Sequence, residues 1–357
     1  MREFYQGKKV LVTGHTGFKG TWMCHVLREF GAEVIGYALE APTNPSLYTL
    51  SGIEGDIHSV IGDVRDLQHL QRVFEEFQPE IVIHMAAQPI VRESYKDPVY
   101  TYDVNVMGTV NVLECVRQSA CVKSFLNVTT DKVYKNREWD WGYRENEELN
   151  GFDPYSNSKS CSELVTDSFR NSFFADGRVA ISTARAGNVI GGGDFAADRI
   201  IPDCCRAIRE GKDIIIRNPH SVRPYQHVLE PVFAYLLIAW KQYEDGRYAG
   251  KYNIGPKDSS CVTTGEIVNA FCEMWNRLSG DTLNWRVEGD GGPHEANLLK
   301  LDCSKMKAVF GWKPVWDYRE AVLKTVEWMD VYVNEGDVRG TMLEQIRAYK
   351  KVLTDEV

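Results

Sequence analysis

The sequence predicts an α/β fold in which a doubly wound parallel sheet is followed by a smaller C-terminal lobe. The first observation is an apolar strand, a glycine-rich turn and a helix within residues 8–30, beginning KKVLVTGHTGFKG. The second is that further apolar strands alternate with helices at intervals of roughly 25 to 40 residues, as βαβ units require. The third is that this alternation fades after residue 188, where the second lobe is expected to begin.

Composition limits the kinds of protein that this chain can be. Its 357 residues suggest about two domains, and a hydrophobic content of 43% supports a sizeable core. A net charge of -9 argues against a nucleic-acid partner. No apolar run approaches the ~20 residues of a membrane helix, and the N-terminus lacks the apolar core of a signal peptide. Nine scattered cysteines without a CxxC pair indicate reduced thiols. We therefore expect a cytoplasmic protein with no membrane partner and no metal site.

The glycine turn has the spacing of a phosphate-binding corner. After strand 10–13, Gly14 permits a sharp turn, Gly17 lets the backbone approach a pyrophosphate, and Gly20 lets helix 21–30 pack closely. The helix N-terminus then directs amide groups and a positive dipole end at the phosphates. This predicts a Rossmann-type dinucleotide site, the alternative being a glycine-rich turn without a ligand. The same site includes the side chains between the glycines: His15, Phe18 and Lys19, of which His15 and Lys19 could either tighten or crowd the pyrophosphate.

Residues after the next three strands extend this cofactor site. Glu40 follows strand 33–38 and lies 20 residues after Gly20, where a carboxylate accepts hydrogen bonds from the adenosine ribose. A carboxylate there would repel a 2′-phosphate, so we expect NAD rather than NADP. Asp63 follows strand 59–61 and either faces the cofactor, together with Val64, or caps helix 67–77. Strand 81–84 leads into small residues that let the cofactor pass close to the backbone: Ala86 and Ala87, followed by Gln88.

An acid–base pair is expected on the helix that begins after Asp153. Asp153 and Pro154 have the pattern of an N-cap followed by proline at the first helical position. Tyr155 and Lys159 are four residues apart and share one helix face. A nearby ammonium lowers the pKa of a tyrosine, so this pair could take a proton from an alcohol while hydride leaves the carbon. The alternative is a tyrosine and a lysine on an exposed helix surface.

A second cluster follows strand 124–129. Thr130, Asp131 and Lys132 supply a hydroxyl, a carboxylate and an amine in succession. Active sites of open α/β sheets lie at the carboxyl ends of the strands. Thr130 could hydrogen-bond a reacting hydroxyl, Asp131 could donate a proton if it is neutral, and Lys132 could accept one if it is neutral. A solvated turn is the alternative.

The region after strand 179–185 contains candidate ligands for an anionic substrate. Asn188 precedes a glycine-rich turn, and three arginines follow at Arg199, Arg217 and Arg223. Arginine suits bidentate contacts with phosphate, although each could be a surface residue. His294 precedes an expected strand at 297–302 and is a possible substrate contact. Amphipathic helices at 312–332 and 342–353 are expected to serve core and subunit packing in a homo-oligomer, either a dimer or a tetramer.

Seven motifs occur in order along nearly the whole chain: TGHTGFKG, HMAAQ, TTDKVY, DPYSNSK, RAGNVIGGGD, RPYQHV and LDCSKMKAVFGWKP. Together they resemble nucleotide-sugar 4,6-dehydratases of the extended short-chain dehydrogenase/reductase superfamily. Relatives that act on dTDP- and GDP-sugars usually have Glu where this chain has Lys132, and Lys is typical of the branch that acts on CDP-glucose. The resemblance implies bound NAD, conversion of CDP-glucose to CDP-4-keto-6-deoxyglucose, and deoxysugar supply for surface polysaccharide such as lipopolysaccharide O-antigen. It also implies that Asp63 faces the adenine and that Asn105 is structural.

The resemblance assigns roles to the candidate residues. Tyr155 would remove the 4-hydroxyl proton, Lys132 the C5 proton, and Asp131 would protonate the departing 6-hydroxyl; Lys132 as the C5 base remains open. The three arginines and Asn188 would hold the diphosphate. Residues 1–188 would bind NAD, and residues 189–357 would mainly bind the nucleotide sugar, with some segments returning to the first domain. A nucleotide-sugar 4-epimerase, which needs no acid–base pair for water loss, and a non-catalytic NAD sensor remain alternatives.

Overall fold

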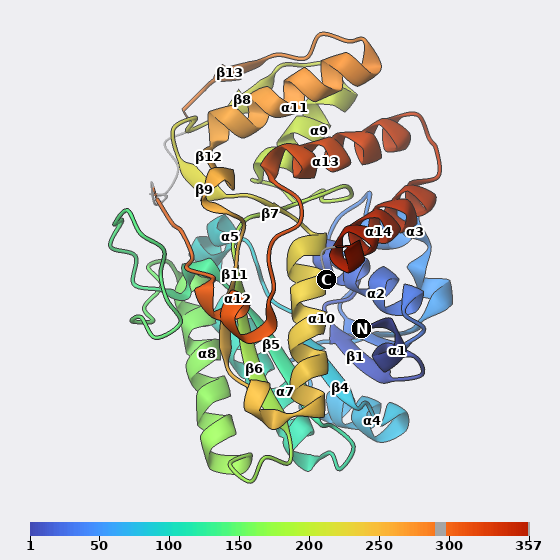
Figure 1. Ribbon diagram of the computed structural model, residues 1–357, viewed down its shortest axis with the longest axis vertical. Coiled ribbons are helices and arrows are strands. Elements are labelled where there is room, and N and C mark those ends of the chain that lie inside the picture. The colour runs from blue at the N-terminus through green and yellow to red at the C-terminus, as the bar shows by residue number, and fades with distance from the viewer. Residues whose placement is uncertain (290–297, 356–357) are drawn as a thin grey trace.

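The central element of the computed structural model, which describes residues 1–289 and 298–355, is a seven-stranded parallel sheet (Figure 1). Its order is β11-β6-β5-β4-β1-β2-β3, and every neighbouring pair is parallel. This confirms the predicted doubly wound α/β fold. The strands are β1 (Lys9–Thr13), β2 (Glu33–Ala38), β3 (His58–Ile61), β4 (Ile81–His84), β5 (Ser124–Thr130), β6 (Ala180–Ala186) and β11 (Lys251–Ile254).

Helices cover both faces of this sheet, because alternate residues of a strand point to opposite faces. In β1, Val10 and Val12 belong to one hydrophobic cluster, whereas Leu11 belongs to the other. The first cluster includes side chains from α2 (Phe18–Glu29), α10 (Leu229–Glu244) and α14 (Val338–Asp355), with α1 (Arg2–Tyr5) at its edge. The second includes side chains from α4 (Leu67–Phe77) and α7 (Gly108–Gln118), with α8 (Pro154–Phe173) beside them.

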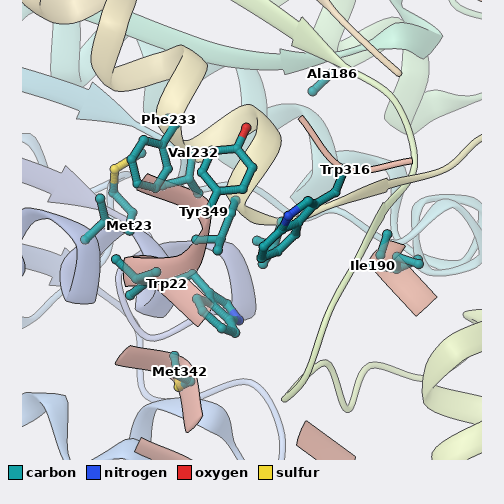
Figure 2. Close-up of a cluster of buried hydrophobic side chains, with 14 of the residues drawn as sticks. Trp22, Met23, Ala186, Ile190, Val232, Phe233, Trp316, Met342 and Tyr349 are labelled. Carbon is teal, nitrogen blue, oxygen red and sulfur yellow. The ribbon is translucent and has the colours of Figure 1, made fainter. Parts of the chain in front are cut away.

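The core between α2, α10 and α14 is rich in aromatic rings (Figure 2). Trp22 from α2, Phe233 from α10 and Tyr349 from α14 are all buried, and the Phe233 and Tyr349 rings lie 4.7 Å apart. Trp316 packs edge-to-face on Tyr349 at 5.0 Å. The C-terminal helix is therefore part of the main core, although it comes from the end of the chain.

The smaller lobe lies beyond the carboxyl ends of the sheet strands (Figure 1). It contains α9 (Ile200–Glu210), α11 (Thr264–Ser279) and α13 (Tyr318–Val333). Three two-stranded sheets accompany them: β7 (Val189–Ile190) with β10 (Gln226–His227), β8 (Ile214–Ile216) with β13 (Trp285–Val287), and β9 (Val222–Pro224) with β12 (Cys261–Thr263). The remaining short elements are α3 (Leu47–Ser51), α5 (Val91–Lys96), α12 (Ser304–Phe310), and the 3₁₀ turns η1 (Ile53–Asp56), η3 (Asp131–Val133), η4 (Gly246–Tyr248) and η5 (Asp258–Ser260).

The long helix predicted at 98–119 is interrupted by a π turn. It consists of α6 (Pro98–Tyr102), the π segment η2 (Asp103–Met107) and α7. Single-turn π segments often mark functional sites. Asn105 lies in this turn, and its amide group exchanges hydrogen bonds with the backbone of Gln88 and donates to the hydroxyl of Ser158. The turn therefore joins the loop after β4 to helix α8.

Two predictions for the C-terminal region are wrong in their bounds. The strand expected at 297–302 is reduced to isolated bridges, from Leu298 to Val222 and from Leu301 to Tyr143. The helix expected from residue 312 begins only at Tyr318, after Asp317 as its N-cap. The preceding backbone amides of Val315 and Trp316 instead donate to the buried Glu230 carboxylate, at 3.0 and 2.7 Å. This tertiary contact holds residues 315–316 outside the helix.

Among the described residues, no helix has the length and apolar character needed to cross a bilayer. The described part of the chain also contains no group of three or more potential metal-ligating side chains of the His, Cys, Asp or Glu type. All nine cysteines are free thiols.

Candidate active site

A cavity of about 1020 Å³ runs from the glycine turn, across the carboxyl ends of the strands, to the smaller lobe. Almost every residue predicted for the site lines it: Gly14, Gly17, Phe18, Lys19, Gly20, Glu40, Asp63, Val64, Ala86, Ala87, Gln88, Thr130, Asp131, Lys132, Tyr155, Lys159, Asn188, Arg199, Arg217 and Arg223. Two do not. His15 is outside the lining, and His294 lies outside the described residues. Folding thus brings together residues that are up to 209 positions apart, from Gly14 to Arg223.

Two glycines of the turn, Gly14 and Gly20, are packed too closely against the backbone to carry a side chain. Gly14 has a φ of +79°. A Cβ at Gly14 would lie 2.9 Å from the backbone N of Ala86, and one at Gly20 would lie 2.1 Å from the carbonyl O of Gly14. Gly17 is the N-cap of α2 and supplies no side-chain cap, so the first amides of the helix are not capped. These features suit close approach of a phosphate group to the helix N-terminus.

The His15 side chain packs beneath the glycine turn and does not line the cavity. Its side chain is buried, and its Nε2 hydrogen-bonds with the Ser59 hydroxyl at 2.8 Å. The ring lies against β2 so closely that a Cβ at Gly36 would approach it to 2.4 Å. Lys19, unlike His15, lines the cavity. Its Nζ donates a hydrogen bond to the hydroxyl of Tyr235 at 3.5 Å. Burial lowers the pKa of Lys19 to about 8.

Glu40 and Asp63, the two carboxylates predicted for the adenosine end of the cofactor site, have different surroundings. Glu40 is exposed at the cavity wall just after β2. Both carboxylate oxygens of Asp63, in contrast, accept hydrogen bonds from the Arg65 guanidinium, at 2.6 to 3.1 Å. The alternative that Asp63 caps the next helix is wrong, because Asp66 is the N-cap of α4 and accepts from the His69 amide at 2.9 Å.

Tyr155 and Lys159 lie in the first turns of α8, as predicted. Asp153 caps this helix by accepting from the Ser156 amide at 2.9 Å, and Pro154 is the first helical residue. Burial raises the pKa of Tyr155 to about 12, although a hydrogen bond with Thr130 opposes the rise. Burial also lowers the pKa of Lys159 to about 8, and its Nζ donates to the carbonyl of Val128 at 3.2 Å. The pKa of Tyr155 is thus raised overall, whereas the spacing to Lys159 predicted a lowered one, because burial outweighs the Thr130 hydrogen bond and the charge of Arg199.

Thr130, Asp131 and Lys132 follow directly from the end of β5. The Thr130 hydroxyl donates to Asp131 Oδ1 at 2.9 Å, whereas the other oxygen, Oδ2, is buried and has no hydrogen-bond partner among the described residues. Burial raises the pKa of Asp131, and the charges of Lys132 and Arg223 together with the Thr130 hydrogen bond only partly oppose this. A raised pKa favours the protonated form of the carboxyl group, which is the form that can act as a proton donor.

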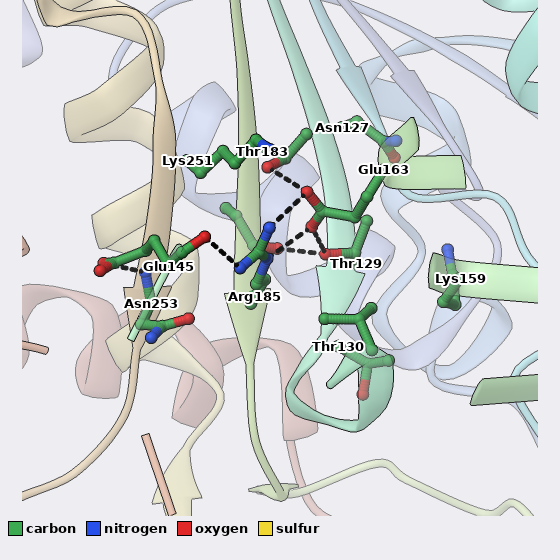
Figure 3. A network of polar contacts seen from close by, with 12 residues as sticks. Asn127, Thr129, Thr130, Glu145, Lys159, Glu163, Thr183, Arg185, Lys251 and Asn253 are labelled. Carbon is green, nitrogen blue, oxygen red and sulfur yellow. Dashed lines mark hydrogen bonds and ion pairs between the residues drawn. The ribbon is translucent and has the colours of Figure 1, made fainter. Parts of the chain in front are cut away.

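A buried ion pair supports this strand end (Figure 3). Glu163 from α8 and Arg185 from β6 pair at 2.9 Å, and neither side chain is exposed. The Glu163 carboxylate also accepts from the Thr129 hydroxyl at 2.5 Å, next to Thr130. The Arg185 guanidinium also donates a hydrogen bond to the hydroxyl of Tyr134 at 2.7 Å. Sequence reasoning missed this pair, although a Glu four residues after Lys159 on the catalytic helix was a possible signal.

The three predicted arginines lie on the lobe side of the cavity. Arg199 pairs with Asp194 at 3.0 Å, and Arg217 pairs with Asp198 at 3.0 Å. Arg223 is buried in β9 and lies near enough to Asp131 to lower its pKa. Sequence reasoning did not predict Asp198, Asp203 and Arg92 in the lining. Asp198 precedes α9 and Asp203 lies within it, and no sequence motif marks either position. Arg92 follows the small residues after β4.

The chain matches the model of a protein family over residues 11–325, and that family is described as GDP-mannose 4,6 dehydratase. It is also 48% identical, over 99% of both chains, to the CDP-glucose 4,6-dehydratase of Salmonella typhimurium (strain LT2). The chain belongs to this dehydratase family. A more distant relative, a probable dTDP-glucose 4,6-dehydratase of Sinorhizobium fredii, is 28% identical over 90% of this chain and 92% of its own length. The predicted family resemblance is confirmed.

Solved structures of similar fold include both dehydratases and epimerases. The dTDP-glucose 4,6-dehydratase of Bacillus anthracis in complex with NAD aligns with a TM-score of 0.75 and 24% identity, over 92% of this chain and 98% of that one. The Thermus thermophilus UDP-glucose 4-epimerase complex with NAD aligns with a TM-score of 0.78 and 24% identity, over 90% and 99%. These structures support the fold. The family's sequence relatives favour dehydration over epimerisation.

Proposed function

We propose that this protein is a hydro-lyase that converts CDP-D-glucose to CDP-4-keto-6-deoxy-D-glucose, with NAD as its cofactor, in deoxysugar biosynthesis for surface polysaccharide such as O-antigen. The observation that carries the proposal is the convergence of two pairs in one cavity, Tyr155 with Lys159 and Asp131 with Lys132. An alcohol oxidation alone needs only the first pair. The second pair suits loss of water, and the 48% identity to a curated CDP-glucose 4,6-dehydratase indicates the nucleotide.

The residues around the glycine turn suit NAD. Uncapped amides at the N-terminus of α2 and the missing side chains at Gly14 and Gly17 would accommodate the pyrophosphate. Glu40 would accept hydrogen bonds from the adenosine ribose, and Lys159 would hold the nicotinamide ribose. When bound, this cofactor supplies reversible oxidation of the sugar at C4 and reduction at C6.

The side chains at the strand ends would move the protons. Tyr155 would take the proton of the 4-hydroxyl, and Thr130 would hydrogen-bond the same oxygen. Because burial raises the pKa of Tyr155 to about 12, a positive charge placed beside this residue would be needed to favour the phenolate. The 4-ketone acidifies the C5 hydrogen, which Lys132 would remove. Asp131, in its protonated form, would protonate the departing 6-hydroxyl, so that water leaves, and C5 would then be reprotonated.

The lobe would bind the nucleotide and orient the distant sugar. Arg199, Arg217 and Arg223 are suited to the diphosphate, with Asn188 beside them. We assign NAD mainly to residues 1–188 and the nucleotide sugar mainly to residues 189–357; His294 would be a further substrate contact. Contacts with a nucleotide remote from the reacting carbons can supply the energy that fixes the sugar for reaction.

We also infer a cytoplasmic homo-oligomer, a dimer or tetramer. Free cysteines suit a reducing compartment. Large apolar side chains are exposed on α6, η2 and α8, namely Val99, Met107, Leu164 and Phe173. Clusters of exposed apolar residues commonly form subunit contacts. Light scattering after size exclusion should give a dimer or tetramer, which Leu164→Glu should weaken, whereas a monomeric parent protein would contradict the assignment.

The function is tested by incubating the protein and NAD with a panel of CDP-, UDP-, dTDP- and GDP-glucose. Mass spectrometry should detect loss of one water from CDP-glucose, and the product should absorb in alkali as a 4-keto sugar does. A product of unchanged mass with inverted C4 would identify a 4-epimerase. No turnover of any member of the panel would favour the non-catalytic NAD sensor.

A further inference from the structure

A second cavity, of about 970 Å³, lies where the loop at 140–147 meets α12 and the turn after β11. It shares no lining residue with the active-site cavity. We call it the side groove. The catalytic mechanism uses none of its residues, so its composition requires a separate explanation.

The side groove has a slight excess of basic side chains within a negatively charged protein. Five basic and four acidic side chains line it, although the whole chain has a net charge of -9. Four lysines from separate segments reach it: Lys257, Lys300, Lys307 and Lys313. None of them forms an ion pair with a described residue, whereas the acidic Asp302 is already bound by Arg144 at 3.0 Å. The lysine charges are therefore available to an anion.

An exposed aromatic side chain completes the lining. Trp141 is 61% exposed and stacks on Trp139, with ring centroids 4.9 Å apart and an interplanar angle of 27°. The underlying ring fixes the orientation of Trp141 and leaves its other surface to solvent. Such a ring can stack on a nucleobase of any kind, because every base presents a π face.

We propose that the side groove binds a nucleoside phosphate. The base would stack on Trp141, and the phosphate oxygens would contact the lysines that have no ion-pair partner among the described residues. The combination of an aromatic surface and basic side chains favours a nucleotide over a bare anion. Because stacking discriminates weakly between bases, this site should accept purine nucleotides that the active site does not use.

GDP is a suitable probe, because it matches neither the proposed substrate nor the adenosine half of NAD. Calorimetric titration of the full-length protein saturated with NAD should show one GDP per chain. Trp141→Ala should weaken GDP binding about tenfold, as expected for loss of stacking. Lys307→Ala with Lys313→Ala should weaken it by a similar factor. Lys212→Ala is the control, because this exposed lysine pairs with Glu210 away from the side groove.

Two further measurements separate the side groove from the active site and a nucleotide from a simple anion. Arg223→Ala should leave GDP binding unchanged, since Arg223 belongs to the active-site cavity. Pyrophosphate should bind more weakly than GDP and should be insensitive to Trp141→Ala but not to the lysine double variant. Four outcomes would each overturn the proposal. The first two are that the parent protein shows no saturable GDP binding, and that the side-groove variants bind GDP as tightly as the parent protein does. The other two are that Arg223→Ala loses GDP binding, and that pyrophosphate binds with the same affinity as GDP.

Discussion

Glu163 and Arg185 form a fully buried ion pair that joins α8 to β6 directly beneath the catalytic end of β5. Burial disfavours the charge of Glu163, but the guanidinium and hydrogen bonds from Thr129 and Thr183 outweigh it, so the pKa of this carboxyl is lowered. The pair therefore stays ionised inside the core. It fixes Thr129, and with it the position of the neighbouring Thr130.

Removing one partner of this pair should destabilise the protein strongly. Arg185→Met would leave Glu163 as an uncompensated buried charge, which typically costs about 3–5 kcal/mol. Urea unfolding should reveal the loss of stability. The double variant Glu163→Leu/Arg185→Met should recover most of it, because no isolated charge remains. An effect of less than about 1 kcal/mol for Arg185→Met would mean that water reaches the carboxylate.

The pH dependence of turnover should report on Asp131. Burial raises the pKa of this carboxyl, so it keeps its proton to a higher pH than an ordinary aspartate. Because the acid form would donate to the leaving hydroxyl under the proposed function, kcat should fall as the pH rises through that raised pKa. Asp131→Asn should lower kcat by about 10²- to 10⁴-fold and should abolish this fall in kcat with rising pH. An unchanged pH profile in the variant would assign the descending limb to another group.

Lys132 and Tyr155 should act at different stages, and their variants should stop at different points. Lys132→Ala should still oxidise C4, so rapid quenching should trap a 4-keto sugar nucleotide that retains its 6-hydroxyl. Tyr155→Phe should give almost none of this species. In heavy water the parent enzyme should place deuterium at C5 of the product. Full dehydration by Lys132→Ala would assign the C5 proton to water or to another residue.

Arg223→Ala should weaken binding of the substrate through its diphosphate group. Charge-assisted hydrogen bonds contribute roughly 1.5–3 kcal/mol, so the KM for CDP-glucose should rise by about one to two orders of magnitude. The affinity for NAD should be nearly unchanged. Arg209→Ala is a matched control, because this exposed arginine contacts Tyr332 at 3.1 Å and lies outside the cavity lining. If the KM of Arg223→Ala equals that of the control variant, Arg223 does not bind the substrate.

Glu40 should select the cofactor. The parent protein should bind NAD more tightly than NADP, because the carboxylate would repel a 2′-phosphate. Glu40→Ala should weaken NAD binding and narrow the difference between the two cofactors. Calorimetric titration of the purified protein with each cofactor measures both effects. Tighter binding of NADP by the parent protein would show that the Glu40 assignment is wrong.

Local sequence patterns determined much of the fold. The six strands of the first part were predicted within one residue of their observed bounds, because short apolar runs ended by glycine or polar residues are local signals. The cap at Asp153 and the shared face of Tyr155 and Lys159 also follow from helical spacing alone. The glycine turn was equally readable, since its φ and close contacts leave no room for a side chain.

Only the tertiary structure decided the properties that depend on distant neighbours. The sequence could not show that Arg223 lies near Asp131, that Arg65 occupies both oxygens of Asp63, or that His15 packs beneath the turn. It also gave the wrong direction for the pKa of Tyr155, because a local lysine was visible in the spacing whereas the burial of the phenol was not. Burial and charge are summed over everything that folding brings within a few ångströms, and most of that comes from elsewhere in the chain.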